Sequence, residues 1–181
     1  MPEGTRWRDR IRSAAQGKAY YAASAHNQHR LKSFSTRTQC YGGTAAALLG
    51  TTAHAAHGGG NDPTGLGRWT YIRIQGKTRS SRLHDLIVVA AYRPNPPGVG
   101  SDTVWAQHRR YLLSKGRKLD PRAAFVSDLQ KAIRGWRNEG CEVIVGVDAN
   151  EDVSLFLPTS FCFKMQSTTT KTTSNDKIKW G

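Results

Sequence analysis

Cysteine is scarce in this sequence, and long apolar runs are missing. The 181 residues include three cysteines, Cys40, Cys141 and Cys162, and none of them forms a CxxC pair. An odd count without that spacing argues against a disulfide framework or a structural zinc site, and it favours a reducing compartment. No run of about 18 apolar residues occurs, so no membrane helix is expected. Residues 1–10 lack the apolar stretch of a secretory signal.

Acidic residues are also few, so the charge balance is strongly positive. Lys and Arg number 27 against 13 Asp and Glu, which gives a formal net charge of +14. Such a field attracts polyanions, and nucleic-acid phosphate is the commonest polyanion that a basic soluble domain meets. A membrane surface, or a basic surface that serves only solubility, remains an alternative on charge alone.

The pattern of apolar residues predicts an α/β domain with a parallel or mixed sheet. A continuous apolar run within residues 83–92 is typical of a central strand covered on both faces. Asp120 followed by Pro121 predicts the start of a helix that ends at Gly140. Further strands are predicted at 45–50, 68–75 and 142–147, a short helix at 8–16, and a helix capped by Ser101 that ends at Gly116.

Two segments are harder to assign. Residues 19–25 fit either a strand or a helix. Residues 54–63 contain Gly58, Gly59 and Gly60 in a row. Because glycine loses much backbone entropy in a regular element, this run predicts a loop.

An acidic cluster follows the last predicted strand. Asp148, Glu151 and Asp152 lie there, together with Asn150. In open α/β sheets the carboxyl ends of the strands line the ligand crevice, and hard cations such as Mg²⁺ prefer oxygen ligands. Taken alone, an Asp-x-Asn pattern after a strand marks a turn or a helix cap more often than a reaction centre.

A second polar turn ends the other strongly apolar strand. It consists of Tyr92, Arg93, Pro94 and Asn95. A tyrosine hydroxyl and an asparagine amide in that place could hydrogen-bond a phosphate. The alternative is a strand that proline terminates, with a tyrosine that only packs. The phosphate hypothesis requires both turns to emerge side by side at one rim of a common sheet.

Six short motifs occur in order within residues 26–153. They are Tyr-Gly-Gly-Thr at 41–44, Asp-Pro-Thr-Gly-Leu-Gly-Arg-Trp at 62–69, Ala-Tyr-Arg-Pro at 91–94, Gln-His-Arg-Arg at 107–110, Pro-Arg at 121–122 with Asp-Leu at 128–129, and Gly-Val-Asp-Ala-Asn-Glu at 146–151. Together they resemble the endonuclease/exonuclease/phosphatase (DNase I-like) superfamily, in the form common beside reverse transcriptases in retroelements. This resemblance implies a partial four-layer α/β sandwich with mixed sheets flanked by helices.

The resemblance also implies hydrolysis of phosphodiesters that depends on Mg²⁺ or Mn²⁺, with DNA as the expected nucleic-acid partner. Asp148 matches the aspartate that orients or deprotonates the attacking water, close to the metal or bound to it. Asn150 matches the partner that holds the scissile phosphate. Tyr92 matches the tyrosine that supports the charged transition state, where prepositioned donors and a cation each contribute on the order of a few kcal/mol.

Other family positions have weaker matches in this sequence. Asn95, Arg93 and Arg109 are the further candidates for contacts with phosphate or nucleic acid. Glu3 and Glu151 are the further candidates for metal ligands. The family carries its metal glutamate on a Gln-Glu strand, and this sequence starts too late to include that strand. The family's Ser-Asp-His motif, whose histidine is the catalytic acid or base, has no match after residue 153.

We therefore expect three segments: a basic segment at 1–25, an incomplete endonuclease-like domain at 26–153, and a divergent, disordered tail at 154–181. The main hypothesis is a retroelement-derived endonuclease domain, intracellular and nuclear when active, with a reverse transcriptase in the same polyprotein. The alternatives are a non-catalytic basic remnant that binds nucleic acid and a phosphatase of the same fold. The unmatched histidine favours an inactive chain over an active one.

Overall fold

The structure is a computed structural model that describes residues 3–29, 42–76, 84–98 and 103–151. Ser101 and the predicted tail at 154–181 lie outside the described residues. The helices and strands that the structure describes all belong to one unit, which ends at Asn150. None of these helices is long and apolar enough to cross a bilayer.

A four-stranded mixed sheet forms the centre of this unit. Its first three strands pair antiparallel, and the last strand runs parallel to its neighbour. A parallel step needs a long crossover, which helices α2 (Val104–Ser114) and α3 (Pro121–Asn138) supply. The predicted mixed α/β sheet is therefore confirmed. Its strands, in spatial order, are β3 (Ala56–Asn61), β4 (Trp69–Ile74), β5 (Leu86–Tyr92) and β6 (Glu142–Asp148).

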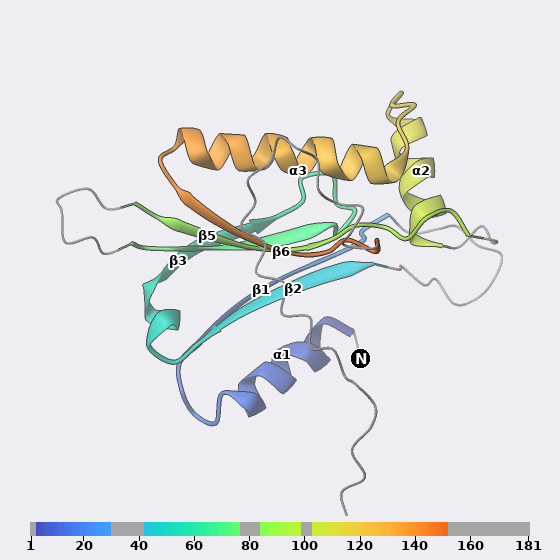
Figure 1. The fold of residues 1–181 in the computed structure, drawn as a ribbon. Helices are drawn as coiled ribbons and strands as arrows, with labels where there is room; N and C mark the ends of the chain where they lie inside the picture. Colours follow the sequence, from blue (N-terminus) through green and yellow to red (C-terminus); the bar gives the residue numbers. More distant parts are fainter. Residues whose placement is uncertain (1–2, 30–41, 77–83, 99–102, 152–181) are drawn as a thin grey trace, which may run out of the picture. The chain divides into compact units, whose positions relative to one another are not determined.

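Helix α3 covers one face of this sheet, because its apolar stripe meets the alternating side chains of the strands (Figure 1). Ile87 and Val89 of β5 are buried there in one cluster with Phe125 of α3. The carboxylate of Asp120 accepts hydrogen bonds from two backbone N–H groups of the first turn, and Pro121 follows it directly. The predicted start of this helix is therefore confirmed.

The other face of β4 and β5 lies against a separate two-stranded sheet. This small sheet pairs β1 (Tyr20–His26) antiparallel with β2 (Gly43–Leu49), so residues 19–25 form a strand rather than a helix. Helix α1 (Glu3–Ala14) adjoins β1. The elements of the unit thus stack in the order helices, mixed sheet, small sheet and helix (Figure 1).

The loop predicted at residues 54–63 is wrong. The chain forms a short 3-10 helix, η1 (Gly50–Ala55), and then strand β3, which carries the three glycines. A Cβ on Gly59 would stand 2.7 Å from the carbonyl oxygen of Tyr71, and one on Gly60 would stand 2.8 Å from the Tyr71 ring. The glycines therefore let β3 approach β4 closely, and the cross-strand pairing offsets their backbone entropy.

The helix cap predicted at Ser101 is also wrong. Helix α2 is capped by Thr103, whose hydroxyl accepts a hydrogen bond from the N–H of Ala106 at 3.2 Å. Ser101 stands two residues earlier in the chain, too far from the first turn to be its cap. Gly116 has a φ of +71° just after the helix, which fits the predicted stop.

Candidate functional site

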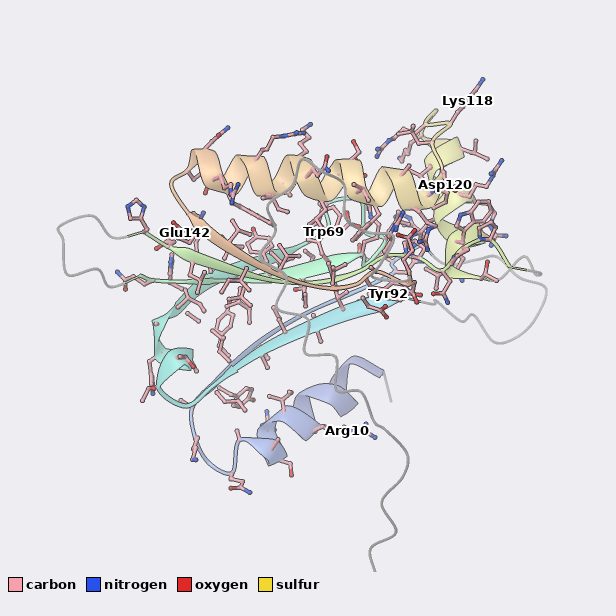
Figure 2. The ribbon with its side chains drawn as sticks, viewed as in Figure 1. Arg10, Trp69, Tyr92, Lys118, Asp120 and Glu142 are labelled. Atoms are coloured by element: carbon pink, nitrogen blue, oxygen red, sulfur yellow. The ribbon has the colours of Figure 1, made fainter. Side chains whose placement is uncertain are left out.

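Tyr92 and Asp148 are the last residues of β5 and β6, and they pair directly across the parallel register. Figure 2 shows Tyr92 at the end of the sheet opposite Glu142, the first residue of β6. Strand residues alternate between the two faces of a sheet. Because Ala91 and Val147 face α3, Tyr92 and Asp148 share the opposite face. The prediction that the two polar turns emerge side by side is therefore confirmed. We call these two turns, residues 92–95 and 148–150, the rim of the sheet.

Hydrogen bonds join the two turns. The N–H of Arg93 donates to the carbonyl oxygen of Asp148 at 2.9 Å. The side-chain amide of Asn150 donates back to the carbonyl oxygen of Arg93 at 2.6 Å. The N–H of Asn150 also donates to Oδ1 of Asp148 at 3.2 Å, and Asn150 has a φ of +48°. Asparagine tolerates this left-handed conformation better than most residues, which suits it to the tight turn after β6.

The hydroxyl of Tyr92 lies within this bonded arrangement. Burial, followed by the negative charge of Asp148, raises the pKa of Tyr92. Hydrogen bonds from the backbone of Asn95 and from the side chain of Asn150 oppose the shift without cancelling it. Tyr92 therefore keeps its proton around neutral pH, and it can donate a hydrogen bond to an anionic oxygen.

The candidates for phosphate contact fall in two places. Arg93 and Asn95 belong to the rim, where Arg93 is partly buried and Asn95 is exposed. Arg109 lies on the exposed side of α2, with its guanidinium 5.1 Å from the ring centroid of Trp105. Arg109 thus belongs to the surface of α2 and not to either of the two turns.

The rim supplies few metal ligands. Among the described residues, no three His, Cys, Asp or Glu side chains gather in a way that could hold an ion. Glu3 opens helix α1 instead of ending a strand, and Glu151 is exposed just after the turn. Mg²⁺ usually takes one or two carboxylates and completes its shell with water and phosphate. A cation at the described part of the rim would therefore be held by Asp148, water and phosphate.

Comparisons with known proteins give no information about the function of this site. Comparisons with protein-family models, curated proteins and solved structures find no match. The superfamily resemblance thus depends on the motifs.

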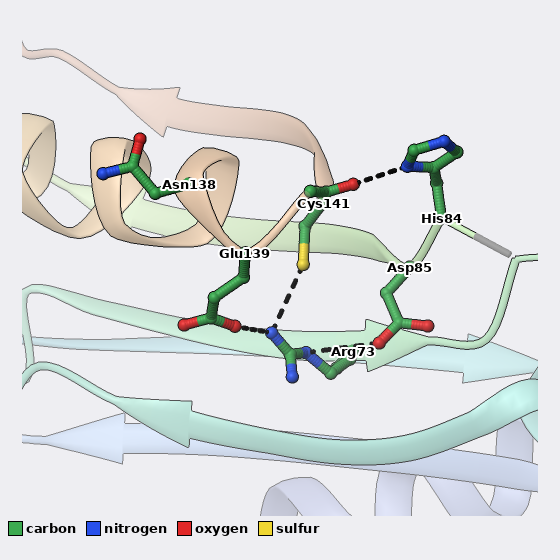
Figure 3. A pocket seen from close by; sticks show the side chains of 7 residues that line it. Arg73, His84, Asp85, Asn138, Glu139 and Cys141 are labelled. Carbon is green, nitrogen blue, oxygen red and sulfur yellow. Dashed lines mark hydrogen bonds and ion pairs between the residues drawn. The ribbon is translucent and has the colours of Figure 1, made fainter. Parts of the chain in front are cut away.

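A second polar cluster lies at the other end of the mixed sheet, where β5 and β6 begin. It lines a pocket of about 440 Å³ (Figure 3). Arg73 donates to Glu139 and to the thiol of Cys141, the latter at 3.3 Å. Arg73 also pairs with Asp85 at 3.7 Å. Two carboxylates already neutralise this guanidinium, so the cluster is better explained as an ion-pair network than as an anion site.

The motif at 62–69 provides a buried ion pair rather than site residues. Arg68 is 1 % exposed. Its guanidinium donates to Asp62 at 2.6 Å and to Asp128 of α3 at 2.9 Å. Burial raises the pKa of Asp62, but the hydrogen bond and charge of Arg68 outweigh burial and lower it overall. This network connects the loop before β4 with α3. The Asp and Arg of the motif at 62–69 therefore serve to stabilise the fold.

Sequence reasoning missed one residue of the rim. In the sequence, Arg122 is part of the Pro-Arg motif at 121–122, and no role at the site was predicted for it. In the structure its side chain is buried and contacts both polar turns. The available signal was an arginine in the first turn of a helix, and sequence alone does not show where such a side chain points.

Proposed function

We propose that this rim is part of the reaction centre of a Mg²⁺-dependent phosphodiester hydrolase that acts on DNA. The observation that carries the proposal is the direct pairing of Tyr92 with Asp148 at the carboxyl ends of two parallel strands. Asn150 supports it by linking the two turns. The layered α/β arrangement is compatible with the sandwich of the DNase I-like superfamily.

The rim residues suit the tasks that the resemblance implies. Asp148 is exposed, so its carboxylate can orient or deprotonate a water molecule. Tyr92 remains a phenol, because its pKa is raised, and it can donate to charge that develops on a phosphate. The side chain of Asn150 hydrogen-bonds the Tyr92 hydroxyl and the carbonyl oxygen of Arg93. A phosphate oxygen beside Tyr92 would therefore meet a donor that is already oriented.

The cation belongs beside Asp148 in this proposal. Mg²⁺ supplies positive charge that offsets the charge of the phosphate during the reaction. The side chain of Asp148 would hold the ion or the water next to it, and Asn150 in the same turn and Tyr92 in the neighbouring turn would hold the phosphate. The exposed Asn95 and the half-buried Arg93 are the next groups that a DNA backbone would meet at this rim.

Nicking of supercoiled plasmid DNA tests the proposal. With Mg²⁺ present, Asp148→Asn should lower the nicking rate at least about 100-fold, because the carboxylate that acts on water and metal is lost. Asp85→Asn is the matched control, since it makes the same change at the opposite end of the sheet. Equal rates for the wild type and Asp148→Asn, or nicking that continues in EDTA, would contradict the proposal.

A non-catalytic DNA-binding protein is the second candidate, and the net charge of +14 favours it. It predicts salt-sensitive binding of DNA without nicking in Mg²⁺ or Mn²⁺. Asp148→Asn would then leave binding intact, because the exposed carboxylate contributes no attraction to phosphate. The plasmid assay and a binding assay on the same preparation separate the two candidates.

A further inference from the structure

Arg122 is a buried arginine that spans the two turns of the rim. It lies in the first turn of α3, and the residue is 8 % exposed. Nη1 donates to the carbonyl oxygen of Pro94 at 2.6 Å, and Nη2 donates to the carbonyl oxygen of Asn150 at 3.4 Å. Pro94 follows β5 and Asn150 follows β6, so one guanidinium contacts both turns.

Helix stability does not explain an arginine at this position. The start of a helix carries partial positive charge, which disfavours a cation in the first turn. Burying a guanidinium also removes it from water, which costs free energy unless good hydrogen bonds replace those to water. The N–H of Arg122 is bonded to the Asp120 cap at 2.8 Å, which fixes the backbone from which the side chain reaches inward.

The chemistry of the guanidinium suits a bridge between two carbonyl groups. It is planar and presents several N–H donors in a fixed fork, so two acceptors can be held at a set separation. A lysine ammonium is a compact point charge on a flexible stem, and it cannot hold both acceptors in the same way. The bridged carbonyls flank the groups proposed to act: Pro94 is two residues after Tyr92, and Asn150 is two residues after Asp148.

We propose that Arg122 is a positioning residue that fixes the separation of the two turns and thereby orients Tyr92, Asp148 and Asn150. What the oriented groups do rests on the proposed function, whereas the bridge itself does not. Without it, the Arg93–Asp148 backbone bond and the Asn150 side-chain bond must hold the turns together. Both lie at the sheet's end, where strands open most easily.

Hydrogen exchange followed by NMR on the full chain tests the bridge. Arg122→Met keeps the side-chain stem and removes the donors. We expect exchange of the Arg93 amide to accelerate at least about tenfold, while the amides of Ile87 and Val89, further from the turn within β5, keep their wild-type rates. The side-chain amide of Asn150 should lose its protection together with Arg93.

Arg117→Met is the matched control, because Arg117 is partly buried and pairs with Asp128 at 2.8 Å, away from the turns. It should leave the exchange of Arg93 unchanged. Arg122→Lys should restore part of the protection at Arg93. Wild-type exchange at Arg93 in Arg122→Met, or equal acceleration at Arg93, Ile87 and Val89, would overturn the proposal, since the residue would then have no local effect.

The activity readout separates this inference from the proposed function. If the chain nicks DNA, Arg122→Met should lower kcat with little change in KM, because orientation is lost while the DNA-contacting surface remains. If the wild type does not nick DNA at all, the proposed function fails. The exchange data then still decide whether Arg122 bridges the two turns.

Discussion

The buried side chain of His108 links the stability of the fold to pH. It lies on α2 and is 1 % exposed, near the buried Arg68 and Asp62. Burial, followed by the positive charge of Arg68, lowers the pKa of His108 from 6.5 to about 4. The folded chain therefore holds the neutral imidazole, whereas an exposed histidine in the unfolded chain binds a proton at a higher pH.

We expect the free energy of unfolding to fall as the pH drops from 6.5 to about 4. In that window the unfolded chain protonates His108 and the folded chain does not, so protons favour unfolding. The decline attributable to this residue is roughly 3 kcal/mol, since one pKa unit corresponds to about 1.4 kcal/mol. Urea unfolding at several pH values, followed by tryptophan fluorescence, should show a flatter profile for His108→Gln.

Two comparisons make this result specific. His54→Gln changes an exposed histidine in the same way and should keep the wild-type decline. Asp62 and Asp128 have lowered pKa values because their arginine partners outweigh burial. Their stabilisation is fully present above pH 3.8 and is lost only as they protonate at lower pH, outside the histidine window. An undiminished decline in His108→Gln would refute this explanation.

Among individual residues, those of the rim could be predicted from the sequence, but Arg122, which bridges its two turns, could not. The positions of Tyr92 and Asp148 were predictable, because each is polar, directly follows an apolar run, and comes from a strand whose carboxyl end faces the same edge. Arg122 was not predictable in this way. Its importance comes from two backbone carbonyls in distant turns, and backbone acceptors leave no signature in a sequence.

Among the elements, β3 shows that neighbouring glycines can have different tasks. A Cβ on Gly58 would meet the Cβ of Arg73 at 3.9 Å, an ordinary contact, whereas one on Gly59 would collide with the backbone of Tyr71. We expect Gly58→Ala to be neutral or stabilising by up to about 1 kcal/mol, because the unfolded chain loses entropy. Gly59→Ala should destabilise by about 1–3 kcal/mol, because the strands must move apart.

Thermal denaturation followed by circular dichroism compares these two variants directly. Each adds one methyl group to the same strand, so they differ mainly in what the methyl group meets. Gly58→Ala should melt at or slightly above the wild-type temperature, and Gly59→Ala clearly below it. A Tm for Gly59→Ala that equals that of Gly58→Ala would show that β3 does not approach β4 as closely as described.

Elements with a strong pattern of their own were predictable, and elements defined by their neighbours were not. The apolar run of β5 and the capped, amphipathic α3 each satisfy local rules. Strand β3 is a strand because Tyr71 and the rest of β4 pair with it, although its glycines favour a loop. Strand β6 was predicted at 142–147; its residues alternate between half-buried and exposed, and Ile144 on its outer face is 57 % exposed.

Across the whole molecule, the excess of positive charge is the strongest property that the sequence shows directly. A net charge of +14 raises the local concentration of any polyanion. If the chain binds DNA as proposed, two contributions must be separated: the field of all charges together, and contacts of individual side chains with phosphate. Arg109 and Lys18 allow this, because both are exposed and they lie in different elements, helix α2 and the turn after α1.

We expect the logarithm of the DNA-binding constant to fall linearly with the logarithm of salt concentration, with a slope of about −0.9 for each neutralised phosphate. Arg109→Ala should reduce the magnitude of that slope by about 1, because one contact is lost. Lys18→Ala removes the same charge and should lower affinity slightly without changing the slope. Fluorescence anisotropy of a labelled duplex, measured in EDTA to prevent hydrolysis, gives both quantities. Equal slopes for the two variants would assign Arg109 to the general field and remove it from the interface, whereas salt-independent binding would mean that charge does not drive recognition of DNA.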